Sequence, residues 1–510
     1  MSSISKAKAF LNVFANWIGF AAGILIAFFM APFMVHQLGD SDYGLWILIG
    51  SFIGYMGLID MGLNNAIVRY ASKYIELDDT DKLNQTFVSA LIIFVVMAVL
   101  IVVLIGTLGQ FFPKVFSVDK SDFEITLIIL LATLDFAISL PVIVFQAMVK
   151  AKQEFVVLNL SIIIGKVLQT ALFVKFLLAG HSIVSLLVID LSLNVAFGIF
   201  FVVYVFRIIP QLKLRGTKVT KESLRNLLSY SFFNFLVAVS NRLIYQTDVL
   251  VIGAYASTSM ITFYAIGANL INYLHSFMRG LHTTLIPRAS ELDAREKHDA
   301  VSKLLLDYSR YGMLIAVPII AIFLFYGETF IGLWMGPKYA AVAGDILVIL
   351  SLAKFVNIPQ LITNSVLRGI GKLKALSAIR IGEGVANLIL SLILVKKYGL
   401  MGVAIGTLIP SVISNAIILP IYICKRFHCS LPRYYWESLL QPSLVLLFLF
   451  LCNRLIDIQP ANYLAFVGAI CLNLVIHAVC VYAFCLSRIE RTHIHGFVLY
   501  HYRNLVPARS

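Results

Sequence analysis

Fourteen apolar segments, each long enough to cross a lipid bilayer as a helix, follow one another along the 510 residues of this chain. A transmembrane helix needs about 20 consecutive apolar residues, and 60% of the chain is hydrophobic whereas 13% is charged. The sequence therefore predicts an all-α, polytopic membrane protein of about 14 transmembrane helices. The predicted segments are 10–37, 44–67, 87–112, 124–149, 155–179, 183–206, 227–253, 260–286, 309–331, 345–367, 376–396, 400–423, 438–456 and 462–486.

The basic residues are concentrated on one side of these segments. If the first residue is cytoplasmic, 28 of the 40 lysines and arginines fall on the cytoplasmic side, six fall in outer turns and six lie within spans. This asymmetry is the positive-inside pattern, and it predicts that both termini are cytoplasmic. The net charge of +14 then reflects topology and attraction to membrane lipids, so no nucleic acid is expected as a partner.

The two halves of the chain resemble each other when the sequence is displaced by 218 residues. The displacement sets identical residues opposite each other, among them Asn16 with Asn234 and Tyr55 with Tyr273. An interval of six helices preserves orientation, which predicts two parallel six-helix repeats followed by an extra helix pair. The predicted domains are an N-terminal lobe (1–206), a cytoplasmic linker (207–226), a C-terminal lobe (227–424), the extra transmembrane pair (425–487) and a basic cytoplasmic tail (488–510).

Polar residues line one face of two segments in the second half. One line includes Asn234 and Arg242, and the other includes Asn269, Asn272 and Arg279, at the spacing of a helical face. A charge at bilayer depth costs about 3 kcal/mol on insertion scales, so it normally faces a bundle interior or a wet cavity. We therefore expect these faces to line a substrate cavity.

Three more residues are candidates for the same site. Asn16 lies on the equivalent face of the first helix, and Lys354 lies near Asn357 and Pro359 within an apolar segment. Lys354 either lines the cavity or is structural. Asp60 lies near the cytoplasmic end of the second segment, where it either pairs with a neighbouring helix or couples transport to an ion gradient.

Other intramembrane charges have simpler explanations. Asp135 and Lys166 lie near the middle of the fourth and fifth segments and are predicted to form a buried pair, whereas Asp190 has no evident partner. Arg380 and Glu383 are three residues apart, which predicts a pair within one helix. We find no pattern that predicts catalytic residues, a cofactor or a metal site, and the short outer turns argue against an enzyme.

Two motifs resemble a known group of proteins. The stretch Leu38-Gly39-Asp40-Ser41-Asp42-Tyr43-Gly44-Leu45-Trp46 resembles the turn between the first two helices of polysaccharide transporters of the MOP flippase superfamily, which includes the Wzx-type O-antigen flippases. The later stretch Asp248-Val-Leu-Val-Ile-Gly253, followed by Phe263-Tyr264-Ala265, resembles the junction of the seventh and eighth helices in that group.

This resemblance implies a V-shaped bundle in the bacterial inner membrane. Such a protein moves an undecaprenyl-diphosphate-linked oligosaccharide, the repeat unit of O-antigen, capsule or exopolysaccharide, across the membrane by alternating access. Arg242 and Arg279 fit the cationic cavity of the group. Polysaccharide polymerase and chain-length regulator proteins are expected partners besides the lipid-linked substrate. The alternatives are a MATE-type cation-coupled multidrug antiporter and a membrane polysaccharide polymerase or ligase.

Overall fold

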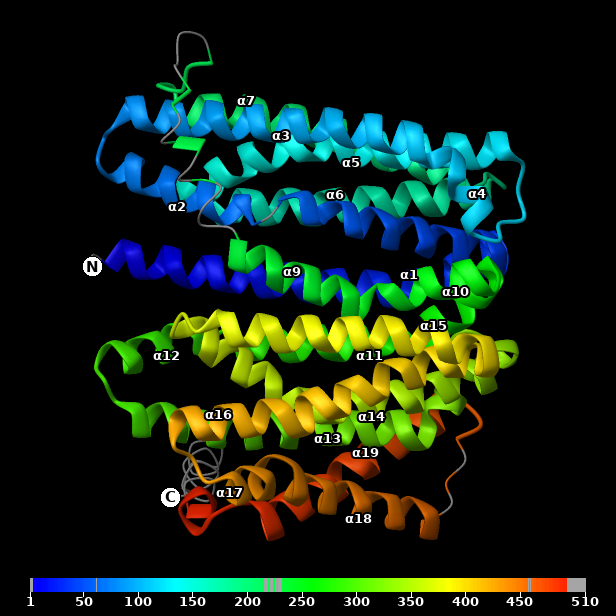
Figure 1. Ribbon diagram of the computed structural model, residues 1–510. Coiled ribbons are helices and arrows are strands. Elements are labelled where there is room, and N and C mark those ends of the chain that lie inside the picture. Colours follow the sequence, from blue (N-terminus) through cyan, green and yellow to red (C-terminus); the bar gives the residue numbers. More distant parts are fainter. Residues whose placement is uncertain are drawn as a thin grey trace, which may run out of the picture. The chain divides into compact units, whose positions relative to one another are not determined.

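The computed structural model describes residues 3–60, 62–214, 219–220, 223–224, 227, 232–456, 458 and 460–492, without the side chains of 3–21, 108 and 232–234. The described chain is a succession of helices joined by short turns (Figure 1). The helices are α1 (Ser3–Met56), α2 (Leu63–Glu76), α3 (Thr80–Leu108), α4 (Phe112–Val115), α5 (Asp122–Ala151), α6 (Phe155–Leu178), α7 (Ile183–Ile208), α9 (Phe232–Tyr245), α10 (Thr247–Tyr255), α11 (Thr258–His282), α12 (Leu285–Ala294), α13 (His298–Trp334), α14 (Pro337–Gly369), α15 (Leu373–Val412), α16 (Leu419–Phe427), α17 (Leu431–Tyr435), α18 (Gln441–Ile456) and α19 (Tyr463–Cys480).

Many of these helices are long and apolar enough to cross a membrane. In the described part of the chain there are ten such helices, or eleven if α9 and α10, which meet at 44°, form one span. The prediction of an all-α, multi-pass membrane protein is therefore confirmed. Helices overlap every predicted segment, but α1 and α15 each run through two of them, so the number of helices does not give the number of spans. The count of fourteen spans and the two repeats stay predictions.

Both of these long helices change direction at a glycine. Gly39 within α1 has φ 76° and ψ 171°, and Gly399 within α15 has φ 55° and ψ −134°. Glycine enters the positive-φ region without the steric penalty that a Cβ brings. Both glycines fall in the turns predicted between consecutive segments, so each long helix consists of two helices joined at a glycine.

The chain divides into two compact units. Unit 1 comprises Met1–Ala265 and Arg380–Gly406, and unit 2 comprises Ile266–Ile379 and Thr407–Ser510. The domain boundaries that the sequence predicts at 206 and 226 stay predictions.

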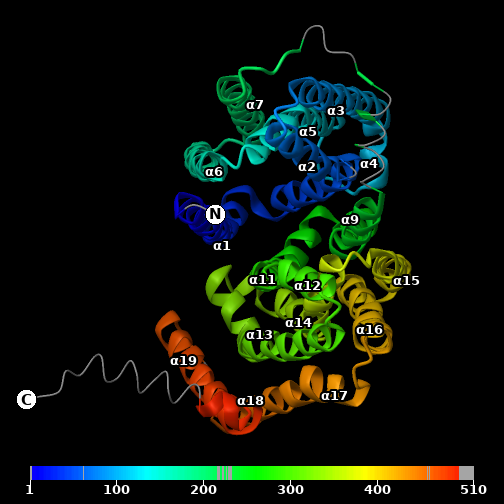
Figure 2. The same cartoon turned by 90° about the vertical axis from the view of Figure 1, so that its left-hand side faces the viewer.

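Within unit 1, α3, α5 and α7 run side by side (Figure 1 and Figure 2). Edge-to-face contacts among Phe87, Phe145 and Phe206 fill the space between these three helices. Helix α6 packs against α1 and α7.

Within unit 2, α13 and α14 form a closely packed antiparallel hairpin. One face of α13 packs on α18 and α19 (Figure 2). The packing is through a buried cluster that includes Val317, Leu449 and Cys480. The extra helix pair is thereby attached to the body of unit 2 by burial of apolar side chains.

Candidate functional site

The first motif lies against the corner between α10 and α11 in unit 1. A Cβ on Gly44 would lie 1.8 Å from the carbonyl oxygen of Thr258, and one on Gly54 would lie 2.2 Å from Oε1 of Gln246. Ser41 Oγ and Thr258 Oγ1 are hydrogen-bonded at 3.0 Å. Glycine at these two positions therefore lets α1 approach the α10–α11 corner at Thr258 and the α9–α10 junction at Gln246 more closely than any other residue would permit.

Arg242 occupies the last turn of α9 next to this contact. The hydroxyl of Tyr55 donates to the backbone oxygen of Arg242 at 3.0 Å, and a Cβ on Gly57 would lie 3.4 Å from Nη2 of Arg242. Arg242 is half-buried. Its side chain thus lies close to the 3₁₀ turn Gly57–Asp60 that follows α1.

Asp60 does not lie within a continuous helix. The predicted segment 44–67 is interrupted by the 3₁₀ turn Gly57–Asp60 and by Gly62, which has φ 77° and precedes α2. The Oδ1 of Asp60 accepts a hydrogen bond from the backbone N–H of Asn64 at 3.3 Å. Asp60 therefore stabilises the first turn of α2, which the helical pattern alone did not indicate.

Two of the predicted asparagines lie on helices of unit 1. Asn16 lies in α1 and Asn234 in α9, but both side chains lie outside the described part. With Arg242 and Asp60, these residues belong to unit 1.

The second predicted polar line lies on α11, in the part of this uninterrupted helix that belongs to unit 2. Helix α11 carries Asn269, Asn272 and Arg279 at helical spacing. Asn272 and Arg279 are exposed, and Asn269 is half-buried. These polar groups are available to a ligand on this side of α11.

Lys354 lies on α14, inside unit 2, and its side chain reaches α11. Its side chain is buried, with 4% of the residue exposed. Its Nζ lies 2.8 Å from Nδ1 of His275 on α11 and 3.3 Å from Oδ1 of Asn357 on α14. The sequence prediction singled out Lys354, but only the structure reveals His275 as its partner.

A buried amide network extends from this lysine. Asn357 donates to Oδ1 of Asn415 at 3.2 Å, and Gln360 donates to the backbone oxygen of Asn415 at 2.8 Å and to the hydroxyl of Tyr434 at 2.9 Å. Asn415 lies in the π-helical turn Ile413–Ile418 that follows α15. The network therefore joins α14 to this turn and to α17.

The predicted Asp135–Lys166 pair is wrong. Asp135 instead accepts a hydrogen bond from Asn194 at 3.0 Å, and Lys166 donates to Gln169 at 2.8 Å. Gln169 in turn donates to Asp190 at 2.5 Å. Two amides therefore take the place of a direct ion pair, and Asp190, for which the sequence showed no partner, has one.

These groups line an open cavity of about 300 Å³ in unit 1. It lies between α5, α6 and α7, and the sequence did not predict it. A neutral amide such as Gln169 or Asn194 is common on helices and carries no signature of its own, so only the folded arrangement shows that it belongs to a site.

The intrahelical pair predicted between Arg380 and Glu383 is confirmed. Nη1 of Arg380 lies 3.0 Å from Oε2 of Glu383, and both side chains are buried in unit 1. Such a pair satisfies both charges locally, so it has a structural role.

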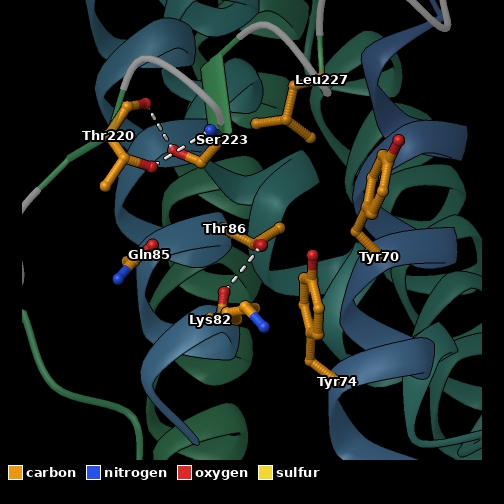
Figure 3. A pocket seen from close by; sticks show the side chains of 8 residues that line it. All are labelled: Tyr70, Tyr74, Lys82, Gln85, Thr86, Thr220, Ser223 and Leu227. Carbon is orange, nitrogen blue, oxygen red and sulfur yellow. Dashed lines mark hydrogen bonds between the residues drawn. The ribbon is translucent and has the colours of Figure 1, made fainter. Parts of the chain in front are cut away.

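A second, smaller cavity of unit 1 is lined by Tyr70, Tyr74 and Lys82 together with residues of the predicted linker (Figure 3). Ser223 of the linker is hydrogen-bonded to Ser89 of α3 at 2.7 Å. The cavity volume of about 30 Å³ holds little more than a water molecule. This region therefore attaches the described part of the linker to α3 and does not bind a large ligand.

The comparisons with known proteins agree with the motifs. The family model described as "Polysaccharide biosynthesis protein" matches residues 33–344. A relative from Shigella flexneri, named "Putative O-antigen transporter", is 24% identical over 416 residues, which are 79% of this chain and 95% of the relative. A relative from Haloferax volcanii, named "Probable low-salt glycan biosynthesis flippase Agl15", is 21% identical over 402 residues, which are 78% of this chain and 79% of the relative.

Solved structures show the same fold. The lipid II flippase MurJ in an inward closed conformation is similar with a TM-score of 0.69 and 16% identity, over 93% of this chain and 98% of that chain. An inward-facing MATE family multidrug transporter of the MOP superfamily is similar with a TM-score of 0.66 and 15% identity, over 80% of this chain and 94% of that chain. Because the family match spans more than half of the sequence, this protein belongs to the polysaccharide biosynthesis protein family, as its two motifs predicted.

Proposed function

We propose that this protein is a flippase, not an enzyme, and that it moves a lipid-linked oligosaccharide across a bacterial inner membrane. The family match over residues 33–344 is the observation that carries the proposal. The printed names of the Shigella and Haloferax relatives support it. The cargo is an undecaprenyl-diphosphate-linked repeat unit of O-antigen, capsule or exopolysaccharide, and both termini of the protein are cytoplasmic.

The anionic head of the cargo requires positive charge along its path. We assign this role to Arg242 of unit 1 and to Arg279 of unit 2, since an arginine can bind a phosphate through two parallel hydrogen bonds. Lys354 is too buried for direct contact in the described arrangement, so it acts by holding α11 through His275.

The sugars and the energy source involve other residues. Asn16, Asn234, Asn269 and Asn272 bind hydroxyl groups of the oligosaccharide, because an amide both donates and accepts hydrogen bonds. Asp60 couples the movement to the proton gradient. Transport proceeds by alternating access, and a polymerase and a chain-length regulator receive the cargo.

The fold alone does not separate a flippase from a MATE-type drug antiporter, since both kinds of transporter are similar in structure to this chain. The family match favours glycan transport over drug efflux. A polymerase or ligase is disfavoured by the short outer turns of the sequence.

A complementation experiment tests the proposal. Deleting the gene in its native host should abolish the surface glycan and cause the lipid-linked repeat unit to accumulate on the cytoplasmic leaflet. The wild-type gene should restore the glycan, whereas Arg279→Ala at equal protein level should not. Arg288→Ala is the matched control, because Arg288 is exposed and ion-paired to Glu291 on α12. Normal glycan in the deletion strain, combined with new sensitivity to cationic drugs, would instead establish an antiporter.

A further inference from the structure

The cavity of about 300 Å³ between α5, α6 and α7 combines several kinds of chemistry in one place. Asp135, Lys166 and Asn194 lie near the middle of their helices, and Gln146 extends the lining toward the α5–α6 connection. The volume is at the lower end of the range for small-molecule sites, which is about 300–1,000 Å³. Polar groups at this depth are expensive unless the cavity is wet or holds a polar ligand.

Several of these groups have hydrogen-bonding capacity to spare. Asn194 and Gln169 each donate to Oδ1 of an aspartate, Asp135 and Asp190 respectively. Within the described residues, no hydrogen bond reaches the second carboxylate oxygen of either aspartate or the amide of Gln146. Lys166 uses one of its three N–H groups, toward Gln169. The cavity therefore offers free acceptors and free donors at the same time.

An aromatic ring completes the lining. Phe197 lies along the cavity, and a Cβ on Gly165 would lie 3.2 Å from its ring, so the glycine makes room for the ring. A sugar ring has a rim of hydroxyl groups that both donate and accept, and an apolar C–H face that packs on an aromatic ring. The lining of this cavity is complementary to both features.

The charges narrow the class of sugar. Two carboxylates and one ammonium group leave the lining with one net negative charge when all three are ionised. An acidic sugar would be repelled by this charge, whereas a neutral or an amino sugar would not. A metal cation is a poor occupant because Lys166 lines the same cavity, and no group of three or more His, Cys, Asp or Glu residues in the described part could hold a metal ion.

We infer that this cavity is a subsite for one neutral or amino-substituted sugar residue of the transported oligosaccharide. The inference rests on the proposed function and adds to it a place in unit 1 where the sugar is recognised, apart from the arginines that attract the diphosphate. Asn194 and Gln169 orient the two aspartates, while Gln146, Lys166 and the free carboxylate oxygens contact the hydroxyl groups.

The test uses the full-length protein in lipid nanodiscs and saturation-transfer NMR with free N-acetylglucosamine, glucose and glucuronate. We expect saturation transfer to N-acetylglucosamine or glucose and none to glucuronate. Gln146→Leu should weaken the binding about fivefold, the effect of losing one hydrogen bond. Gln85→Leu on α3, the same change of residue type at the small cavity of Figure 3, is the control and should leave binding unchanged.

A second variant shows whether weaker binding comes from the lost contact or from misfolded protein. Phe197→Leu keeps an apolar side chain and should also weaken sugar binding, in protein that remains monodisperse. The inference is overturned if glucuronate binds as well as glucose, or if both variants bind sugar as the wild type does. It is also overturned if sodium raises the unfolding temperature in an Asp135-dependent way while no sugar binds. In each of these cases, loss of the surface glycan when the gene is deleted would still support the proposed flippase function. The sugar subsite and the flippase function can therefore fail independently.

Discussion

The Nζ atom of Lys354 lies 2.8 Å from Nδ1 of His275, and this hydrogen bond joins α14 to α11 inside unit 2. Because an ammonium group only donates, Nδ1 of the histidine accepts, which requires a neutral imidazole. Helix α11 carries Asn269, Asn272 and Arg279 on the same element. Movement of α11 against α14 would therefore strain or break this hydrogen bond.

Replacing Lys354 with methionine should separate stability from transport. Methionine has a similar length without the charge, so the cost of burying an ammonium group disappears and the unfolding temperature should stay the same or rise. Transport should fall about tenfold or more, because a hydrogen bond to a charged group is worth about 1.5–3 kcal/mol. Thermal unfolding and surface glycan are measured together. Lys338→Met, at the exposed start of α14, is the control, and an active Lys354→Met protein would refute the role given to this lysine.

The close approach of α1 predicts intolerance at Gly44. In Gly44→Ala the new Cβ would lie 1.8 Å from a backbone oxygen, so α1 must shift, at a cost of about 1–3 kcal/mol or more. Gly50→Ala adds a Cβ where nothing lies within 4 Å, and it should be neutral or stabilising by about 0.5–1 kcal/mol through helix propensity. Size-exclusion profiles and unfolding temperatures would show the difference. Equal behaviour of the two variants would contradict the described packing.

The buried pair Arg380–Glu383 should matter for stability and not for transport. Glu383→Gln leaves a buried guanidinium group without its counter-charge and should cost about 3–5 kcal/mol. The double variant Arg380→Met with Glu383→Leu should recover most of this loss, because both charges are gone. A double-mutant cycle by thermal unfolding measures the coupling. If the double variant is as unstable as Glu383→Gln, the unpaired charge of Arg380 is not the cause of the lost stability.

The chemistry of phosphate binding predicts the order of activity at position 279. Arg279→Lys keeps the charge but removes the planar fork of N–H donors, so it should retain part of the transport, whereas Arg279→Ala should retain none. The rate of glycan appearance after induction of the gene gives the ranking. Full activity of the lysine variant would mean that charge alone is required.

The segment Ser487–Thr492 should be released from α13 only as the pH falls below about 4. Burial acts to raise the pKa of Glu490, but hydrogen bonds from Tyr311 and Ser487 and the charge of Arg310 outweigh it and lower the pKa to about 2. A carboxylate with a lowered pKa stabilises the fold above its ordinary value of 4.5, and the contribution is lost as the pH falls from there through about 2. Proteolysis of this segment should therefore stay constant from pH 8 to about pH 5 and increase below about pH 4. In Glu490→Gln it should be faster at neutral pH and should not change with pH over this range.

Much of the architecture could be predicted because it depends on local patterns. The apolar segments, the glycine turns near Gly39 and Gly399 and the pair Arg380–Glu383 involve residues close together in the chain. The interruption at Gly57–Asp60 was missed, since an apolar run shows the length of a span but not where packing against Gln246 and Arg242 ends the helix.

The sequence by itself determined the class of protein, its family and the faces of single helices on which charged residues lie, because periodicity and composition act within one segment. Only the tertiary structure decided which partner each polar group has. Asn194 is 59 residues from Asp135, and His275 is 79 residues from Lys354. Helical spacing places residues on a face, but the rotation of that face toward a neighbouring helix is set by packing of the whole unit. For this reason the expected ion pair between Asp135 and Lys166 does not form. Asp135 accepts instead from Asn194, and Asp190 accepts from Gln169, at the cavity of unit 1.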